Sequence, residues 1–582
     1  MTIRSARFAL ALCGAVLMSA CVRMPSDGPV IDVRADATDV STPGISFDPK
    51  PPQKGESATE IVLHFLEAMK ATPIDASVAR QFLSSDAKVR WTPERSIMTY
   101  GDVGSPTGEL QVELLLMDLE EYDVRGAWAG SSVQERVRFG MTVESGEWRI
   151  ESLPDALIVP ETWFQDRYRR VSLHFFDPTA QILVPEPVFV PDGDQLASSM
   201  VSGLLSDPTD DPRVTRTYVP PGFESGIVPL TSDGIADVSL LGDPSEVDDA
   251  ARELILAQLV WTLRQEDRIQ AVRLAIGEDE QGRLAEAPEF KLFGGDGFDP
   301  NAFDPTGAQA SGDLFGLVDG RVVRGSITSL AATSGPLGTK RFGITSIGVN
   351  LAGDQVAAIS GDGGAVLVAP VDGEGGVKEV ASGARNFLPP AWDFADRIWL
   401  TDRARGGAVI SFVTADQPPR AIAVPGVTGR DVRHVLVSRD GSRLVAVIRT
   451  RQGDRVVTSR ILHNGEGGVL RATRAVALDF LPDTDPPVIR DIGWRSSTSV
   501  SLVTDLTEDR SQVETISVDG SPGALAFEGS TQLAGRTREL VSSPVELAEV
   551  YALARDAVSD LSAPERPLSP PPEGISSLTY VG

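Results

Sequence analysis

A repeat in the second half of the chain constrains the fold most strongly. Residues 349–357 and 437–446 each read as a strand, a tight turn with Ala or Asp before Gly, and another strand. The two turn glycines, Gly353 and Gly441, are 88 residues apart, which is two periods of 44. Trp392 and Trp494 take the equivalent places between and after these copies, and residues 541–553 form a weaker fifth copy. A period near 44 made of strands, without a helical apolar stripe, predicts the four-stranded blades of a β-propeller.

The two ends of the region 313–582 predict how this propeller closes. Residues 314–318 and 321–324 read as strands without a repeat partner, and so do residues 575–581. Joined in one blade, these strands would cover the sheet edges that an open repeat array exposes. The 270 residues of the region divide into six blades of 45, one of them shared by both ends. A pair of β-sandwiches is the alternative interpretation.

The N-terminal end has the layout of a secretory signal. Arg4 and Arg7 precede an apolar run over residues 8–18, which is about half of the ~20 residues that a membrane-spanning helix needs. Residues 17–21 (Leu-Met-Ser-Ala-Cys) resemble the bacterial lipobox, although Met18 stands where Leu is usual. We expect a signal peptide over 1–20, cleavage between Ala20 and Cys21, and a diacylglyceryl anchor on Cys21. An ordinary secreted protein is the alternative.

A lipidated Cys21 predicts a protein held by acyl chains on the extracytoplasmic face of the cell membrane. Cys13, the other cysteine of the chain, lies in the segment that cleavage removes, so no free thiol would remain for redox chemistry. Residues 21–56 are rich in Pro, Asp, Ser and Thr and show neither helical nor strand periodicity. We therefore predict a flexible tether between the lipid and the folded part.

Two small α+β domains are expected after the tether. In the first, over 57–165, the capping box Ser57-Ala-Thr-Glu60 starts a helix. A later strand alternates Val137, Phe139, Met141 and Val143 with polar residues. Helices before a curved antiparallel sheet suggest an NTF2-like or cystatin-like domain, which could serve as a spacer, a docking module or a ligand pocket. The second domain, over 166–280, has a helix at 194–206 with Asp194 as the expected N-cap. Residues 281–312 are rich in Gly, Asp and Pro and are predicted to form a linker.

The second domain resembles a known family. Residues 205–208 (Leu-Ser-Asp-Pro), 219–222 (Val-Pro-Pro-Gly), 236–238 (Ala-Asp-Val) and 258–263 (Gln-Leu-Val-Trp-Thr-Leu) match the GerMN pattern in order and spacing over about 110 residues. That resemblance implies binding or assembly rather than chemistry. The order of lipobox, tether, α+β domain, GerMN-like domain and propeller resembles the actinobacterial lipoprotein LpqB family over the whole mature chain.

The LpqB resemblance implies an accessory of the MtrA–MtrB two-component system that touches the extracellular part of the sensor histidine kinase and serves cell-wall homeostasis and division. One alternative is a lipoprotein that binds cell-wall glycan or peptidoglycan. Another is a propeller enzyme, which should line its channel with His, Arg and perturbed acids.

Composition and motifs argue against the enzyme. The net charge of -29 makes nucleic acid a poor partner. The four histidines (His64, His174, His434, His463) have no metal-ligand spacing, and no nucleophile elbow, phosphate loop or zinc-protease motif occurs. The sequence therefore predicts no catalytic residues, no metal site and no cofactor, and it assigns Trp392 and Trp494 to the cores of successive blades.

Overall fold

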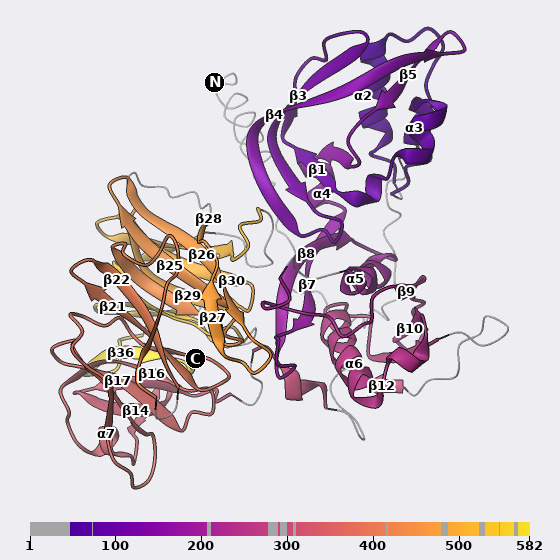
Figure 1. Ribbon diagram of the computed structural model, residues 1–582. Helices are drawn as coiled ribbons and strands as arrows, with labels where there is room; N and C mark the ends of the chain where they lie inside the picture. Colours follow the sequence, from indigo (N-terminus) through magenta and orange to yellow (C-terminus); the bar gives the residue numbers. More distant parts are fainter. Residues whose placement is uncertain are drawn as a thin grey trace, which may run out of the picture.

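The computed structural model describes residues 47–582 except 73, 207–210, 278–288, 292–298, 307–309, 415–416, 479–486, 523–529, 546–547 and 564–568. Cys21, Ala20 and the predicted tether as far as residue 46 lie outside the described residues. Figure 1 shows two α+β domains, one above the other, and a body of antiparallel sheets beside the second of them. The domain layout expected from the sequence is confirmed.

In the first domain, helices cover one side of a strongly bent sheet (Figure 1). The helical elements are α2 (Ala58–Ala68), η1 (Ala79–Phe82), α3 (Ser85–Arg90), η2 (Pro93–Arg95) and α4 (Glu161–Gln165). The strands are β1 (Ile97–Tyr100), β2 (Asp102–Val103), β3 (Gln111–Tyr122), β4 (Trp128–Glu144), β5 (Glu147–Ser152) and β6 (Leu157–Pro160), in the order β5-β4-β3-β1-β6 with β2 on β3. The predicted capping box starts α2: the Ser57 backbone N–H donates to Glu60 Oε2 at 2.8 Å, and the Glu60 N–H donates to Ser57 Oγ at 3.3 Å.

The second domain packs two helices between a hairpin and a second sheet. Its elements are β7 (Tyr168–Phe176), β8 (Leu183–Pro191), α5 (Leu196–Leu205), β9 (Glu224–Ser225), β10 (Ile235–Leu241), η3 (Pro244–Glu246), α6 (Asp249–Leu263), β11 (Ala271–Ile276) and β12 (Glu289–Lys291). The sheet order is β12-β11-β10-β9, with β10 and β11 parallel, and β7 pairs with β8.

Two details of this domain differ from the sequence prediction. The N-cap of α5 is Gln195, without a side-chain hydrogen bond, so the prediction of Asp194 as the cap was wrong. A turn in which the Leu196 N–H donates to the Gly193 carbonyl oxygen starts the helix instead. Strand β12 lies in the predicted linker over 281–312, where it pairs antiparallel with β11; edge pairing outweighs the loop-like composition there.

The described strands after residue 313 form six successive antiparallel sheets. They are β13 (Leu314–Val318), β14 (Arg321–Ser326) and β15 (Ser329–Ala332) with β36 (Ile575–Thr579); β16 (Ile344–Val349), β17 (Gln355–Ser360), β18 (Val366–Pro370) and β19 (Lys378–Ala381); β20 (Ala391–Trp392), β21 (Arg397–Ala404), β22 (Gly407–Thr414) and β23 (Arg420–Ile422); β24 (Val432–Val437), β25 (Arg443–Thr450), β26 (Gly453–His463), β27 (Val469–Ala472) and β28 (Val476–Leu478); β29 (Ile489–Ser496), β30 (Ser499–Thr507), β31 (Arg510–Ser517) and β32 (Thr531–Ala534); and β33 (Thr537–Val541), β34 (Tyr551–Ala554) and β35 (Val558–Asp560). Short helices precede this body at η4 (Pro300–Phe303) and interrupt it at α7 (Pro336–Thr339).

The innermost strands close a ring. Strand β36 contacts β16, and contacts continue through β20, β24, β29 and β33 back to β36. As the sequence predicted, the C-terminal strand β36 shares a sheet with β13, where Gly316 pairs with Leu578. This pairing covers the edge of β13 and makes β36 the innermost strand of the shared sheet.

Buried indoles and partly buried carboxylates join neighbouring sheets near the ring axis. The Trp392 indole N–H donates to the Gly348 carbonyl at 3.1 Å, and the Trp494 indole N–H does the same to Val437 at 3.1 Å. Both tryptophans are buried, so their expected place in the core is confirmed. An innermost strand is an edge strand whose amides need partners. Asp491 accepts from the Leu540 N–H at 2.8 Å, and Glu539 accepts from the Leu578 N–H at 2.9 Å.

Candidate binding site in the first domain

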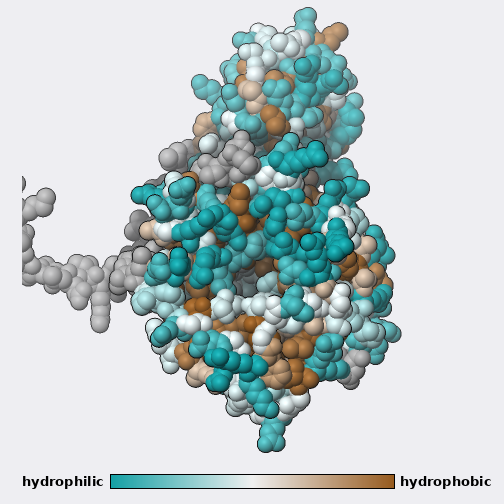
Figure 2. Space-filling view, turned by 90° about the vertical axis from the view of Figure 1, so that its left-hand side faces the viewer, coloured by the Kyte–Doolittle hydropathy of each residue, from teal (hydrophilic) through white to brown (hydrophobic). Residues whose placement is uncertain are grey.

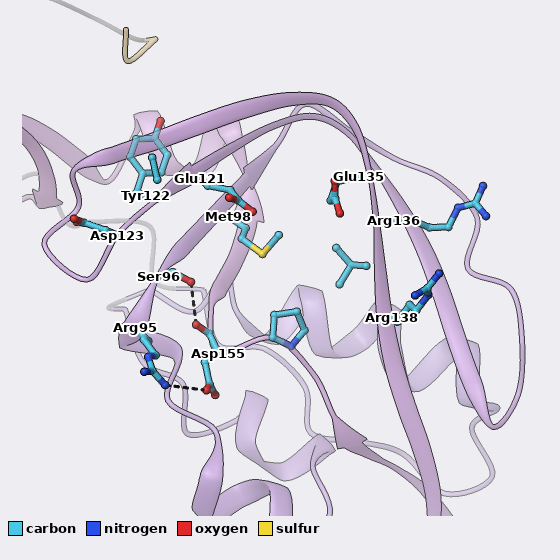
Figure 3. Close-up of a pocket in the computed structure, with 13 residues that line it drawn as sticks. Arg95, Ser96, Met98, Glu121, Tyr122, Asp123, Glu135, Arg136, Arg138 and Asp155 are labelled. Carbon is cyan, nitrogen blue, oxygen red and sulfur yellow. Dashed lines mark hydrogen bonds and ion pairs between the residues drawn. The ribbon is translucent and has the colours of Figure 1, made fainter. Parts of the chain in front are cut away.

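A hollow of about 640 Å³ lies inside the bend of the first domain's sheet (Figure 3). Two irregularities bend β3 around it: Asp118 takes a left-handed conformation with φ of 51°, and the register with β4 shifts between Glu121 and Tyr122. Strand β4 follows the bend along its whole length (Figure 1). The hollow is therefore built on strands, and a site on strands is more precisely positioned than one on loops.

The floor of the hollow is apolar and carries two carboxylates. Met98 and Val137 are buried in the domain core, and Pro154 lies beside them. Glu121 pairs directly with Met98 across β3 and β1, and Glu135 lies two residues before Val137 on β4, so both carboxylates share the side of these apolar residues. Figure 3 shows both carboxylates turned toward the cavity. Neither has a hydrogen-bond or ion-pair partner among the described residues.

The arginines near the hollow are paired with other acids. Arg138 Nε lies 3.1 Å from Glu113 Oε1, and Arg136 Nη1 lies 3.6 Å from Glu113 Oε2. Both arginines turn away from the cavity in Figure 3. At the opposite rim, Arg95 Nη1 lies 3.8 Å from Asp155 Oδ2. The charge that faces the interior without a partner is therefore negative.

Sequence reasoning missed Glu121 and Glu135, but one of them left a signal. In a half-buried strand, residues of one parity face the core. Glu135 has the same parity as Val137, Phe139 and Met141, which the sequence already placed on the core side. A carboxylate at such a position needs either a partner or an opening to solvent, and the hollow provides the opening.

Aromatic rings join the first domain to the second. Tyr122 stacks on Phe164 at 4.7 Å, Phe164 stacks on Tyr168 at 4.5 Å, and Phe189 meets Tyr122 edge-on at 5.1 Å between ring centroids. The Phe189 N–H also donates to the Gly126 carbonyl at 2.8 Å, and a Cβ at Gly126 would lie 1.9 Å from the Phe189 carbonyl oxygen. This approach admits only glycine at position 126.

A buried ion cluster joins the second domain to the propeller. Glu186 of β8 accepts from Arg460 Nη1 at 3.1 Å and from Arg443 Nη2 at 3.4 Å. The Arg443 side chain is only 6% exposed. Burial, together with the nearby Arg460 charge, lowers the pKa of Arg443 to about 10, against the opposing effect of Glu186. The Glu186 carboxylate thus offsets the free-energy cost of burying the two arginine charges.

A second buried arginine fixes the segment that enters the propeller. Arg439 Nη2 donates to the Val581 carbonyl at 2.7 Å, and Arg439 Nη1 also donates to the Thr306 carbonyl. Burial lowers the pKa of Arg439 to about 10. The Trp261 indole N–H of α6 donates to the Pro300 carbonyl of the same segment at 2.7 Å. The contacts of Glu186 hold the second domain against β25 and β26 of the propeller, and Arg439 holds the preceding segment against the C-terminal end.

Figure 2 views the molecule from the propeller's side, away from the second domain. Hydrophilic side chains surround a central hollow on this face, and apolar side chains gather below it. His434 Nδ1 lies 3.2 Å from Asp491 Oδ1, which joins adjacent sheets near the axis. Burial raises the pKa of Glu539 to about 7, and Asp491 adds to the shift. Asp491 thus pairs with His434, and Asp491 and Glu539 each accept a hydrogen bond from a backbone amide of a neighbouring strand.

The other histidines are structural or peripheral. Burial lowers the pKa of His174 to about 3, and the Arg264 charge contributes. Burial likewise lowers the pKa of His463 to about 3, with a contribution from Arg397. His64 lies at the surface, 2.6 Å from Glu56. Within the described ranges, no three His, Cys, Asp or Glu side chains are grouped so that they could hold a metal ion.

Three family models match the chain, one for each domain. Residues 51–165 match the N-terminal domain of lipoprotein LpqB, residues 172–281 match the sporulation and spore germination domain, and residues 320–552 match the LpqB β-propeller domain. The chain belongs to the lipoprotein LpqB family. The LpqB and GerMN resemblances found in the sequence are thereby confirmed.

Curated LpqB relatives match over most of the chain. The lipoprotein LpqB of Cutibacterium acnes is 27% identical over 86% of this chain and 87% of its own length. That of Mycobacterium bovis BCG is 28% identical over 87% of each chain. Membership in a lipoprotein family associates the chain with membranes. Among the helices of the described part, none has the length and apolar character of a membrane span.

Solved structures match individual parts of the fold. A chain of a nidogen/laminin complex is 14% identical with a TM-score of 0.32, covering 46% of this chain and 97% of its own. The tandem GerMN domains of the sporulation protein GerM from Bacillus subtilis are 18% identical with a TM-score of 0.17, covering 21% of this chain and 44% of their own.

Proposed function

We propose that this LpqB-family chain is a lipid-anchored, extracytoplasmic accessory of an MtrA–MtrB type sensor histidine kinase, and that it acts by binding rather than catalysis in cell-wall homeostasis and division. The hollow of the first domain carries the proposal. Its unpaired carboxylates and apolar floor suit recognition, and its lining contains no histidine and no cysteine.

The buried contacts between domains support this role. A binding surface held on a fixed arm loses less conformational freedom on association than one on a loose chain. The aromatic cluster around Phe164 and the ion cluster around Glu186 join the first domain to the second and the second to the propeller. A partner that docks on the first domain would therefore meet a preformed surface.

The proposed anchor at Cys21 limits the distance between the membrane and the folded domains. From Cys21 to Phe47, the first described residue, the chain has 26 residues. Such a segment reaches at most roughly 90 Å when fully extended. The folded domains would thus remain within reach of a kinase's extracytoplasmic part in the same membrane, and tethering raises the effective concentration of the two proteins.

Direct binding tests the proposal. The full-length lipoprotein is reconstituted in nanodiscs and titrated with the purified extracytoplasmic domain of the kinase, with binding followed by interferometry. We expect saturable binding with a Kd in the micromolar range or tighter. Failure to bind a folded kinase domain, together with retention of purified cell wall by the same sample, would instead favour the glycan-binding alternative.

A further inference from the structure

Glu121 and Glu135 are unpaired carboxylates over an apolar floor, and this combination selects a chemical class of ligand. We propose that the hollow of the first domain binds an extended segment of a protein partner through a lysine or arginine side chain of that segment. The inference deepens the proposed function and rests on it for the identity of the partner.

The geometry matches an amphipathic cation. A lysine or arginine side chain has an apolar stem of three or four methylenes and a charged head. Met98 and Val137 provide apolar surface for the stem, and Glu121 and Glu135 lie beside them for the head. Arg136 and Arg138 are held outside by Glu113, so neither competes for the two carboxylates.

The size and charge of the hollow point to a peptide segment. Ligand pockets commonly enclose about 300–1,000 Å³, and 640 Å³ is enough for a few residues. The net charge of -29 attracts basic partners over a longer range. An anionic ligand would meet unpaired carboxylates on the floor and repulsion from the whole chain.

The test uses two fluorescein-labelled hexapeptides, Gly-Leu-Lys-Val-Lys-Gly and Gly-Leu-Glu-Val-Glu-Gly, with the full-length lipoprotein in nanodiscs. We expect only the lysine peptide to bind, and its affinity to fall as NaCl rises from 50 to 500 mM. The double variant Glu121→Gln/Glu135→Gln should weaken its Kd about tenfold, the scale of two partly screened ion pairs.

The control variant Glu109→Gln/Glu151→Gln removes the same amount of charge from exposed positions of the first domain outside the hollow. It should leave the affinity within about twofold. Equal loss in both variants, or equal binding of both peptides, would overturn the proposal, because net charge alone would then explain the affinity. Circular dichroism verifies that each variant is folded.

Binding measurements with the kinase domain distinguish a failure of this proposal from a failure of the proposed function. If the kinase domain binds and Glu121→Gln/Glu135→Gln leaves its Kd unchanged, the hollow is not the docking site although the accessory function stands. If the lysine peptide binds at the hollow and the kinase domain does not bind at all, the accessory function fails and the site stands.

Discussion

Replacing Glu186 by Gln should uncouple the second domain from the propeller. The change removes the charge that Arg443 and Arg460 share, and both arginines stay in place with side chains only 6% and 18% exposed. At 3.1–3.4 Å and an effective dielectric constant of about 20, each ion pair contributes a Coulomb energy of roughly 5 kcal/mol, against which burial costs a similar amount.

The net loss of stability in Glu186→Gln depends on the two arginine charges that remain. Burial already lowers the pKa of Arg443 to about 10 with Glu186 present. Without the carboxylate, two buried cations face each other. Removal of one partner from a buried ion pair usually costs about 3–5 kcal/mol, and we expect Glu186→Gln to destabilise the interface by that amount.

Differential scanning calorimetry of the full chain measures this loss. We expect the transitions of the second domain and the propeller to separate in Glu186→Gln, with the lower one shifted down by several degrees. Glu253→Gln, an exposed position on α6, is the control and should melt as the parent does. A triple variant that replaces Glu186, Arg443 and Arg460 by Leu, Met and Met should recover much of the stability. If Glu186→Gln melts like the control, the ion cluster does not hold the domains together.

Three further predictions follow from single residues. Burial raises the pKa of Glu539 to about 7 from an ordinary 4.5, so the folded protein keeps a proton that the unfolded chain releases, and this group lowers stability as pH rises from about 4.5 to 7. In urea unfolding of the propeller, Glu539→Gln should therefore be about 3 kcal/mol more stable than the parent at pH 8 and differ little from it at pH 4.5. An equal difference at both pH values would refute the assignment. Ser57→Ala breaks the capping box of α2 and should cost about 1 kcal/mol in thermal unfolding of the first domain, whereas an unchanged melting temperature would show that the cap contributes nothing. Cys21→Ala should abolish incorporation of labelled fatty acid and release the protein from membranes, and a variant that still fractionates with membranes would refute the lipid anchor.

The features predictable from the sequence are those with a period or a short motif. Gly353 and Gly441 lie two periods of 44 residues apart, with Trp392 and Trp494 at equivalent places of other copies, and this repeat indicated a propeller. The unpartnered strands at the two ends of the region indicated that both ends share one sheet. The Ser57 capping box is likewise local, since its two partners are three residues apart. Such signals survive because secondary structure repeats at a fixed interval along the chain.

The features that sequence reasoning missed depend on tertiary contacts. Glu186 lies 257 residues from Arg443 and 274 from Arg460, and no spacing rule relates them. Strand β12 exists because β11 offers an edge, although its own neighbourhood is rich in Gly and Pro. Glu121 follows Asp118, whose left-handed φ of 51° interrupts the alternation of β3, and the sequence pattern of β3 does not reveal this interruption.

Site-specific photo-cross-linking in intact cells tests the central claim most directly. A benzophenone amino acid is placed at Ala129, which lines the hollow, or at Val143, which is exposed on β4 outside it, in the full-length lipoprotein. We predict that the Ala129 position captures the extracytoplasmic domain of the sensor kinase and that the Val143 position does not. Recovery of no kinase from Ala129, in cells where the kinase is demonstrably present, would contradict the account.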